Sequence, residues 1–436
     1  MTALIVIAAI LVLYGTFSRP LDARGVTSAL ALMLVGLFVG SSALGWIDVS
    51  PAAATAEHVA ELALALLLFS DAARIDLRAL RAHLAWPGRL LLIGLPLAMI
   101  AGTLAGLLLF PALAFASVAL LSIMLCSTDA ALGQRVVTDE AVPARVRQAL
   151  NVESGLNDGL AVPFFLVFVD ISLAELHGNP LTAVLSRAAA QIGWGVLAGV
   201  GAAAVGALLV TFADRRGWIE SPWRQVMTLA TAALAYFGAL VLGGSGFIAA
   251  FAGGMVFGGL AGTGGPAYTR FTEDAGDLLA CATWIGFGAV ALGHALGAIT
   301  WQVALYAVIS LTVVRMVPVA LAMLGSGARR PTVAFVGWFG PRGLASIVFA
   351  LIAVDDHVPD AQTLLTTVTV VVALSVVAHG LSSAPLVGRY ARWFTTHTAV
   401  HSGAEEAAPT KEPWARRRKT VVRAAAGSPS DEGRRR

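Results

Sequence analysis

Apolar residues occur in long blocks separated by short polar breaks along most of the chain. Most blocks approach the roughly 20 residues that an α-helix needs to cross the hydrocarbon layer of a bilayer. The blocks predict thirteen helices, over residues 2–17, 26–46, 57–73, 88–110, 112–133, 147–170, 187–212, 226–242, 245–262, 277–297, 299–324, 332–353 and 361–387. The pattern therefore predicts an all-α polytopic membrane protein.

The composition supports this class. Of the 436 residues, 58% are hydrophobic and 13% are charged, whereas a soluble chain carries about 25% charged residues. The first block has no Lys or Arg before it, so we expect a membrane span there and not a cleaved signal. Cys126 and Cys281 both lie inside apolar blocks, which favours packing roles over a structural disulfide.

Basic residues alternate with the predicted helices. The breaks after the odd-numbered helices contain Arg19, Arg24, Arg74, Arg78, Arg81, Arg89, Arg135, Arg145, Arg147, Arg215, Arg216, Arg224, Arg270, Arg329 and Arg330. Near the other breaks, Arg187 is the only Lys or Arg. Cytoplasmic loops are enriched in Lys and Arg, so we expect a bacterial inner membrane protein with its N-terminus outside and its C-terminus in the cytoplasm. Residues 398–436 are polar and basic, and are expected to form a disordered cytoplasmic tail.

Four polar side chains lie together in the sixth predicted helix. Glu153 and Asn157 are one turn apart on one face, and Ser154 and Asp158 are one turn apart on the neighbouring face. A charge inside a membrane span is costly and usually serves a function. A buried network that ties helices together is the alternative, but two carboxylates beside hydroxyl and amide oxygens favour a site for a hard cation such as Na+.

Two predicted helices contain interruptions. The fifth contains Asp129 directly after a Ser and a Thr, whose side chains compete for backbone hydrogen bonds. The twelfth contains Gly340-Pro341-Arg342-Gly343, which should break a helix. The two helices are seven apart, which predicts two inverted six-helix repeats with broken fifth and twelfth helices and an ion site at the membrane midplane. We expect Arg342 to pair with Glu153.

The motifs Thr128-Asp129, Glu153-Ser154 with Asn157-Asp158-Gly159, and Gly340-Pro341-Arg342-Gly343 resemble the cation/proton antiporter-1 family, specifically its NhaP-type Na+/H+ exchangers. The resemblance covers residues 1–390 and implies one transmembrane antiporter domain, in which a core domain and a dimerisation domain are interleaved. It further implies a homodimer in pH homeostasis that exchanges one cation for one proton by alternating access. It implies no enzyme activity, no cofactor and no nucleic-acid partner; the partners would be the cation, the proton and membrane lipid.

The resemblance also assigns roles to individual residues. Asp129 and Asp158 would ligate Na+ together with Ser154 and the Thr128 main-chain carbonyl, and Asn157 would orient the site. Glu153 and Arg342 would form a supporting ion pair. Competition between cation and proton for Asp158 would couple the two fluxes. Arg315 is expected to be structural, pairing with Asp71 or with an acidic residue of the core. Many members have Pro after the Asp of the fifth helix, where this chain has Ala130, which leaves the degree of unwinding and the ion selectivity open.

Three alternatives remain. K+/H+ exchange uses the same oxygens, and a cation channel could line a pore with them, although no repeated ring of ligands is evident. A membrane protease would use Gly243-Gly244-Ser245-Gly246 with His294 or His379, but it leaves the buried carboxylates unexplained. No phosphate-binding loop or metal-spaced Cys/His set is present in the sequence.

Overall fold

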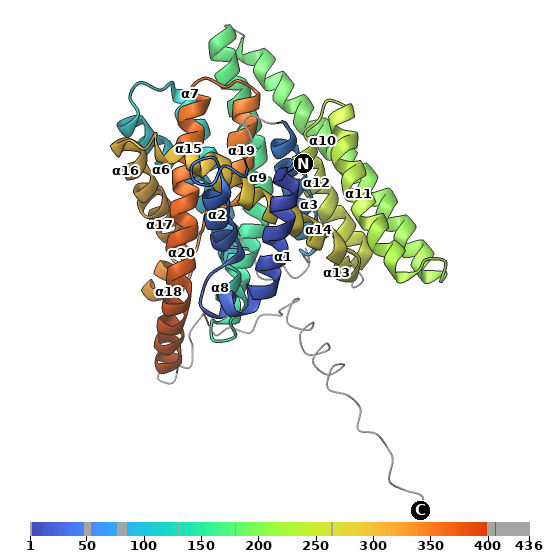
Figure 1. The fold of residues 1–436 in the computed structure, drawn as a ribbon. Helices are drawn as coiled ribbons and strands as arrows, with labels where there is room; N and C mark the ends of the chain where they lie inside the picture. Colours follow the sequence, from blue (N-terminus) through green and yellow to red (C-terminus); the bar gives the residue numbers. More distant parts are fainter. Residues whose placement is uncertain are drawn as a thin grey trace, which may run out of the picture.

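The computed structural model of the chain describes residues 2–47, 54–75, 85–129, 131–178, 180–262, 265–398 and 406. Within these residues the regular structure is helical, and the only β pairing is one isolated bridge between Gly40 and Ile47. The helices pack as an elongated bundle, with α10 and α11 on one side and α16, α17 and α20 on the other (Figure 1).

Eight described helical segments are long and apolar enough to cross a membrane. They contain α1 (Thr2–Ala23), α5 with η1 and α6 (Ala85–Arg89, Leu90–Gly94, Leu95–Leu109), α9 (Ala144–His177), α10 (Leu181–Arg215), α11 (Ser221–Val241), α14 with η3 and α15 (Arg270–Gly286, Phe287–Leu292, Gly293–Leu296), α16 with α17 (Trp301–Leu311, Val313–Ala322) and α20 (Ala361–Thr398). Both η segments are π-helical turns that continue the neighbouring α-helices.

The remaining helices are shorter or carry more charge. They are α2 (Ser28–Val39), α3 (Ala54–Ala73), α7 (Phe115–Met124), α8 (Gln134–Thr138), α12 (Gly246–Ala261), α13 (Gly265–Tyr268), α18 (Arg330–Trp338) and α19 (Leu344–Asp355). Each of the thirteen predicted segments overlaps at least one observed helix. The interruptions expected in the fifth and twelfth segments are present, because α7 stops at Met124 and α18 stops at Trp338.

Several helices extend beyond the apolar blocks that predicted them. α9 continues to His177 and ends at Gly178, which adopts a left-handed conformation (φ 67°). Glycine reaches this conformation without a steric penalty and commonly ends helices in this way. Hydropathy therefore located the membrane-crossing part of α9, and the turn residue determined its end.

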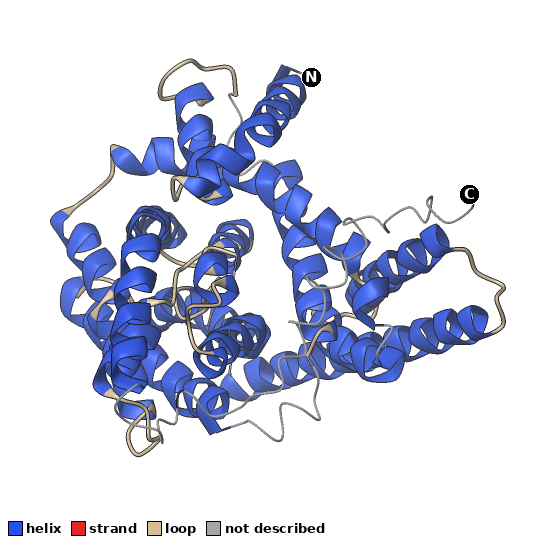
Figure 2. Cartoon of the chain, turned by 90° about the horizontal axis from the view of Figure 1, so that it is seen from below, coloured by secondary structure: helices blue, strands red, loops and turns tan. Residues whose placement is uncertain are grey.

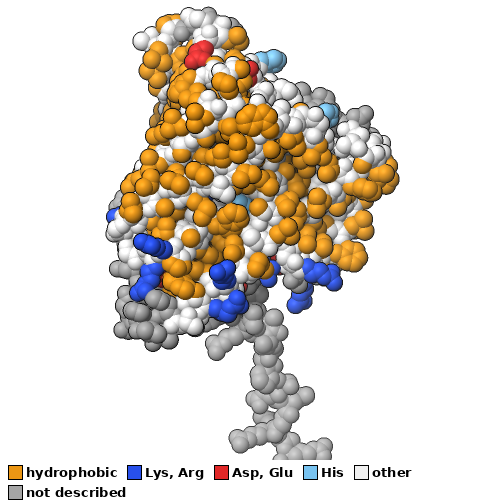
Figure 3. All heavy atoms as spheres, turned by 90° about the vertical axis from the view of Figure 1, so that its left-hand side faces the viewer, with side chains coloured by type: hydrophobic (Ala, Val, Ile, Leu, Met, Phe, Trp, Pro, Cys, Tyr) orange, Lys and Arg blue, Asp and Glu red, His pale blue; other side chains and the backbone are white. Residues whose placement is uncertain are grey.

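The outer surface of the bundle is apolar over its middle. Space-filling atoms in Figure 3 show hydrophobic side chains across most of the face, with Lys and Arg confined to its lower end. Individual side chains are strongly exposed, such as Leu108 at 82% and Val241 at 87%. Exposed apolar surface on this scale is unfavourable in water and is matched by lipid.

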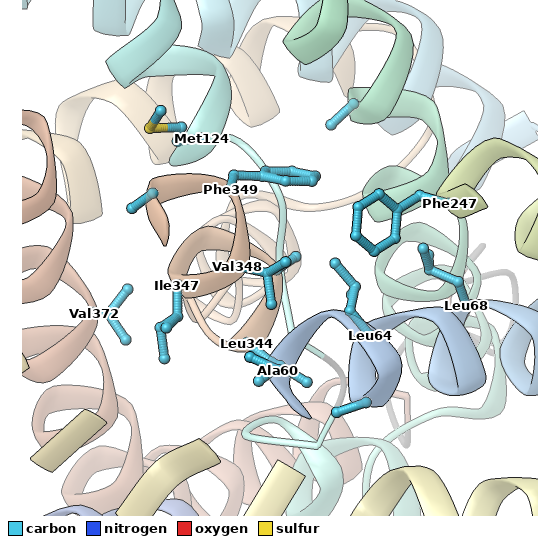
Figure 4. Close-up of a cluster of buried hydrophobic side chains, with 14 of the residues drawn as sticks. Ala60, Leu64, Leu68, Met124, Phe247, Leu344, Ile347, Val348, Phe349 and Val372 are labelled. Carbon is cyan, nitrogen blue, oxygen red and sulfur yellow. The ribbon is translucent and has the colours of Figure 1, made fainter. Parts of the chain in front are cut away.

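The interior is closely packed around α19. Leu344, Val348 and Phe349 of α19 face apolar side chains from α3 and α12, including Leu64 and Phe247 (Figure 4). The Phe349 ring stacks on Phe165 of α9 with ring centroids 4.5 Å apart.

Small residues bring neighbouring helices into contact. At Gly254 of α12, an added Cβ would overlap the Phe69 carbonyl of α3. Close backbone approach at small residues is typical of helix packing in membranes. These contacts place α3, α9, α12 and α19 around the interrupted segments. Loop segments run among the helices inside the bundle when it is seen from below (Figure 2).

Candidate functional site

Two non-helical segments cross inside the bundle. The first follows α7 and leads to Asp129, and the second runs over residues 339–343 between α18 and α19. The backbone N–H of Asp129 donates a hydrogen bond to the Pro341 carbonyl at 2.8 Å. This bond joins two segments that lie more than 200 residues apart in sequence.

Charged side chains satisfy the helix ends at this crossing. The Leu344 N–H, at the start of α19, donates to Asp129 Oδ2 at 3.1 Å. Arg342 Nη1 donates to the carbonyl oxygens of Cys126 (2.7 Å) and Ser127 (3.1 Å), just beyond the end of α7. A helix N-terminus is partially positive and a C-terminus partially negative, so each charge opposes the dipole that it contacts.

Glycines allow the second segment to lie against these side chains. A Cβ added at Gly343 would overlap the Asp129 carboxylate, and one added at Gly340 would overlap the Arg315 guanidinium. Pro341 between them has no N–H to donate to a helix. The Gly-Pro-Arg-Gly string therefore both breaks the helix and leaves room for the charges beside it.

The polar stripe of α9 meets the first segment. Asn157 Nδ2 donates to Thr128 Oγ1 at 2.6 Å, and the hydroxyls of Thr128 and Ser154 are 3.0 Å apart. Asp158 is close enough for the charges of Asp129 and Asp71 to act on it. The structure thus brings Thr128, Ser154 and Asn157 into contact, and the binding of an ion by the proposed set of residues stays a prediction.

The two aspartates are held differently. Asp129 Oδ1 accepts from the N–H groups of Ala131 (2.8 Å) and Leu132 (3.4 Å), while Oδ2 accepts from Leu344. Asp158 Oδ1 is buried and makes no hydrogen bond among the described residues, although the Ser127 hydroxyl, which has no other partner there, lies within reach of the carboxyl group. A buried oxygen without a donor is costly, and a cation or a proton would satisfy it. Asp129 is therefore fixed by its surroundings, whereas Asp158 has an oxygen available for a ligand.

The expected pair of Glu153 with Arg342 is wrong. Glu153 instead forms a bidentate ion pair with Arg315 of α17, with Nη1–Oε1 at 2.5 Å and Nη2–Oε2 at 2.8 Å. Both residues are buried. Arg342 is engaged with the carbonyls beyond α7, so it does not pair with Glu153. The expectation that Arg315 pairs with an acidic core residue is confirmed, and Asp71 is not that residue.

Asp71, which the sequence offered only as a possible partner of Arg315, lies in the last turn of α3. Its charge acts on Asp158, and the charge of Asp129 acts on it. Its position at the end of an apolar block suggested a helix end near the membrane surface. A carboxylate that interrupts a span was nevertheless a usable signal. Ala130, where many members have Pro, lies outside the described residues.

The candidate ligands at the site are oxygen atoms. Carboxylate, hydroxyl and amide oxygens are ligands for hard cations. The Na+ expected at Asp129, Asp158, Ser154 and Thr128 would be a transported substrate. Among the described residues, no group of three or more His, Cys, Asp or Glu side chains could hold a metal ion.

The proposed Ser–His dyad is not formed. Ser245 caps α12, where its Oγ accepts a hydrogen bond from the Ile248 N–H at 3.4 Å. His294 Nδ1 contacts the Val290 carbonyl, and His379 contacts Ser375 and Trp338. Neither ring contacts Ser245, so the Gly-rich string serves as a helix junction.

Comparison with known proteins gives consistent matches. The family model described as "Sodium/hydrogen exchanger, transmembrane" matches residues 5–389. The chain is 25% identical over 433 residues to a Na(+)/H(+) antiporter of Saccharomyces cerevisiae, covering 84% of this chain and 42% of the relative. It is 25% identical over 416 residues to the K(+)/H(+) antiporter NhaP of Alkalimonas amylolytica, covering 93% of this chain and 69% of the relative.

A similar fold occurs in a solved structure. The sodium proton antiporter MjNhaP1 from Methanocaldococcus jannaschii superimposes with a TM-score of 0.71 at 17% identity, covering 87% of this chain and 99% of that protein. The likeness concerns the fold, because the sequences have diverged widely. The chain therefore spans nearly all of this archaeal protein but less than half of the yeast relative.

Proposed function

The chain belongs to the sodium/hydrogen exchanger family, and we propose that it exchanges a monovalent cation for H+ across the membrane by alternating access. Family membership places it among transporters and not among enzymes. One observation supports the proposal above all others. Asp158 carries a buried carboxylate oxygen that makes no hydrogen bond among the described residues, it is near enough for the charge of Asp129 to act on it, and its helix supplies the Ser154 hydroxyl 3.0 Å from that of Thr128.

We infer the following division of labour within the site. Asp158 binds either the cation or a proton, and Asp129, Ser154 and the Thr128 main-chain carbonyl supply further oxygens to the cation. Asn157 orients Thr128 through the bond from its Nδ2. Because one carboxylate cannot hold a cation and a proton together, loading one releases the other, and the two fluxes are coupled.

The Glu153–Arg315 pair and Arg342 support the site without belonging to it. Glu153 lies one residue before Ser154, and its bidentate bond to Arg315 ties α9 to α17. Arg342 neutralises the carbonyl-rich end beyond α7. Without Arg315, Glu153 would be a buried carboxylate with no partner, and without Arg342 the Cys126 and Ser127 carbonyls would lose their charged donor. Either loss would destabilise the region around the site.

Na+ is the cation that we favour, with exchange of one ion for one proton and no net charge movement. K+ is the alternative, and the relatives support both, because their names include Na(+)/H(+) and K(+)/H(+) antiporters. All the candidate ligands are hard oxygens, which suit either ion. The choice between the two ions depends on cavity size.

We further propose thirteen membrane crossings arranged as two inverted six-helix repeats, with a core and a dimerisation domain interleaved over residues 1–390 in a homodimer. The overlap of each predicted segment with a helix supports this count. The N-terminus would lie outside a bacterial inner membrane, and residues 398–436 would form a cytoplasmic tail. The gathering of Lys and Arg at one end of the molecule supports that orientation (Figure 3).

The test is purified protein in liposomes with an internal pH dye and an imposed proton gradient. Addition of Na+, Li+ or K+ is compared, with and without a voltage clamp by valinomycin and K+. We expect Na+ to dissipate the gradient at a rate that the clamp leaves unchanged. Absence of proton flux with all three cations would refute exchange, and a rate that depends on voltage would refute electroneutrality.

A further inference from the structure

The interrupted segment between α18 and α19 is held by a neighbouring helix. Ser375 and His379 lie one turn apart on α20, and both are buried, at 0% and 1% exposure. Ser375 Oγ accepts a hydrogen bond from the backbone N–H of Arg342 at 2.7 Å. His379 Nε2 is 2.9 Å from the carbonyl oxygen of Trp338. The two side chains therefore contact both ends of the break.

These contacts satisfy backbone groups that the break leaves without helical partners. Trp338 is the last residue of α18, and Arg342 lies two residues before α19 begins. A buried backbone group without a partner costs free energy comparable to a lost hydrogen bond. Ser375 thus supplies the acceptor that the Arg342 N–H would have found in an unbroken helix, whereas the Trp338 carbonyl accepts from the Gly340 N–H at 2.9 Å and has His379 as a second partner.

The imidazole of His379 lies between two backbone carbonyl groups. Nε2 is 2.9 Å from the Trp338 carbonyl oxygen, and Nδ1 is 2.8 Å from the Ser375 carbonyl oxygen and 3.2 Å from Ser375 Oγ. A carbonyl oxygen can only accept, so a neutral ring donates to one of the two carbonyls at a time. With hydrogen on Nε2 the ring donates to Trp338, and the Ser375 hydroxyl, whose Oγ accepts from the Arg342 N–H, can donate to Nδ1.

A second set of contacts clamps the end of α18 to α20. The Trp338 indole Nε1 donates to Ser382 Oγ at 2.9 Å. The Trp338 ring also lies against the His379 imidazole, with ring centroids 5.1 Å apart. The last residue of α18 is thus fixed through its carbonyl, its indole N–H and its ring.

The clamp lies one residue away from the groups that hold the site. Pro341, next to Arg342, accepts the hydrogen bond from the Asp129 N–H. The Arg342 side chain binds the carbonyls of Cys126 and Ser127, directly before Thr128. Any shift of residues 339–342 would therefore move Thr128 and Asp129.

We propose that Ser375 and His379 are positioning residues for exchange, which hold the α18–α19 break so that Asp129 and Thr128 stay at the cation site. The proposal rests on the exchange function proposed above. Neither residue touches the ion. Their loss should lower the affinity for the cation, whereas the maximum rate, which is set by the alternating-access step, should change little.

The test compares Ser375→Ala, His379→Leu and His379→Gln with the control Ser383→Ala. Ser383 is a matched control, because it is buried in the same helix and, among the described residues, its hydroxyl bonds only the Gly380 carbonyl of that helix. The half-saturating Na+ concentration and the maximum rate are measured in liposomes. Backbone amide exchange of the peptide covering residues 339–344 is measured on the same variants.

Loss of one hydrogen bond, worth about 0.5–1.5 kcal/mol, corresponds to roughly a 2- to 12-fold change in an equilibrium constant. We expect Ser375→Ala to raise the half-saturating concentration within that range, with a maximum rate within about twofold of the wild type. His379→Leu should have a larger effect, and His379→Gln, whose amide can still donate to Trp338, should recover part of it. Ser383→Ala should behave like the wild type.

Two results would overturn the proposal. One is an unchanged half-saturating concentration in Ser375→Ala and His379→Leu. The other is an equal rise in Ser383→Ala, which would indicate general loosening of α20. If His379→Leu does not fold, the half-saturating Na+ concentration of Ser375→Ala alone tests the proposal. Should the wild type show no exchange, the proposed function fails, and faster amide exchange at 339–344 in Ser375→Ala but not in Ser383→Ala still tests the clamp.

Discussion

Asp158 and Asp129 differ in how many hydrogen bonds their carboxylate oxygens already accept. Asp129 accepts three backbone hydrogen bonds, whereas Oδ1 of Asp158 makes none among the described residues, where only the Ser127 hydroxyl lies within reach of the carboxyl group. We expect Asp158→Asn to abolish exchange and leave folding intact, because the amide has the same shape but cannot carry the charge that alternates between cation and proton. Na+-dependent change of the pH dye in liposomes, with thermal unfolding as the control, measures both effects. Full wild-type flux in this variant would exclude Asp158 as the exchanging group.

Glu153 and Arg315 form a pair whose removal should affect stability more than ion binding. Arg315→Ala leaves Glu153 buried without its partner, which typically costs about 3–5 kcal/mol of unfolding free energy. Replacing both residues by apolar side chains, as in Glu153→Leu with Arg315→Met, should restore most of that loss, since no uncompensated charge remains. Thermal unfolding of the wild type, the two single variants and the double variant in detergent gives the coupling free energy between residues 153 and 315. Additive single effects would contradict a direct pair.

At the scale of elements, the α18–α19 break depends on a position where no side chain fits. A Cβ at Gly343 would overlap the Asp129 carboxylate, whereas one at Gly337 would meet Met316 at an ordinary 3.5 Å. Gly343→Ala should therefore raise the half-saturating Na+ concentration at least tenfold, because displacing Asp129 forfeits more than about 1.4 kcal/mol of its ligand contact. Gly337→Ala in α18 is the matched control and should stay within about twofold. Equal behaviour of the two variants would mean that Asp129 tolerates displacement.

The same elements show what the sequence can predict. Hydropathy located the helices, and the Gly-Pro-Arg-Gly string and the polar residues around Asp129 located both interruptions, because these are local properties of a few residues. The ion-pair partner of Glu153 could not be predicted in this way, because it lies far from Glu153 in the sequence. Arg315 and Arg342 are both buried arginines in later spans, and only the packing of α17 against the core distinguishes them. Ser375 carried no signal, and His379 was considered only for a protease dyad, because a hydroxyl and an imidazole inside a helix are common and their targets here are backbone atoms.

At the scale of the whole molecule, charge is distributed unevenly between the two ends. The end of α10 and the connection to α11 carry Arg215 and Arg216, whereas the end of α19 and the connection to α20 carry Asp355, Asp356 and Asp360. Retention of basic loops in the cytoplasm fixes the orientation of membrane helices, and acidic residues contribute little. The distribution therefore predicts which end of each helix faces the cytoplasm.

α10 offers a direct test of this orientation. It has 35 residues, so at 1.5 Å per residue it is about 50 Å long and its ends must emerge on opposite sides of a hydrocarbon layer of about 30 Å. Glu175 and Glu220 are exposed residues in the regions before and after it.

After Cys126 and Cys281 are replaced by Ala, we expect a membrane-impermeant maleimide added to intact cells to label Glu175→Cys at once and Glu220→Cys only after the membrane is permeabilised. Both replacements remove an acidic and not a basic residue, so they should not reverse the orientation. Labelling in the opposite order would place the basic loops outside, and labelling of both from one side would mean that α10 does not cross.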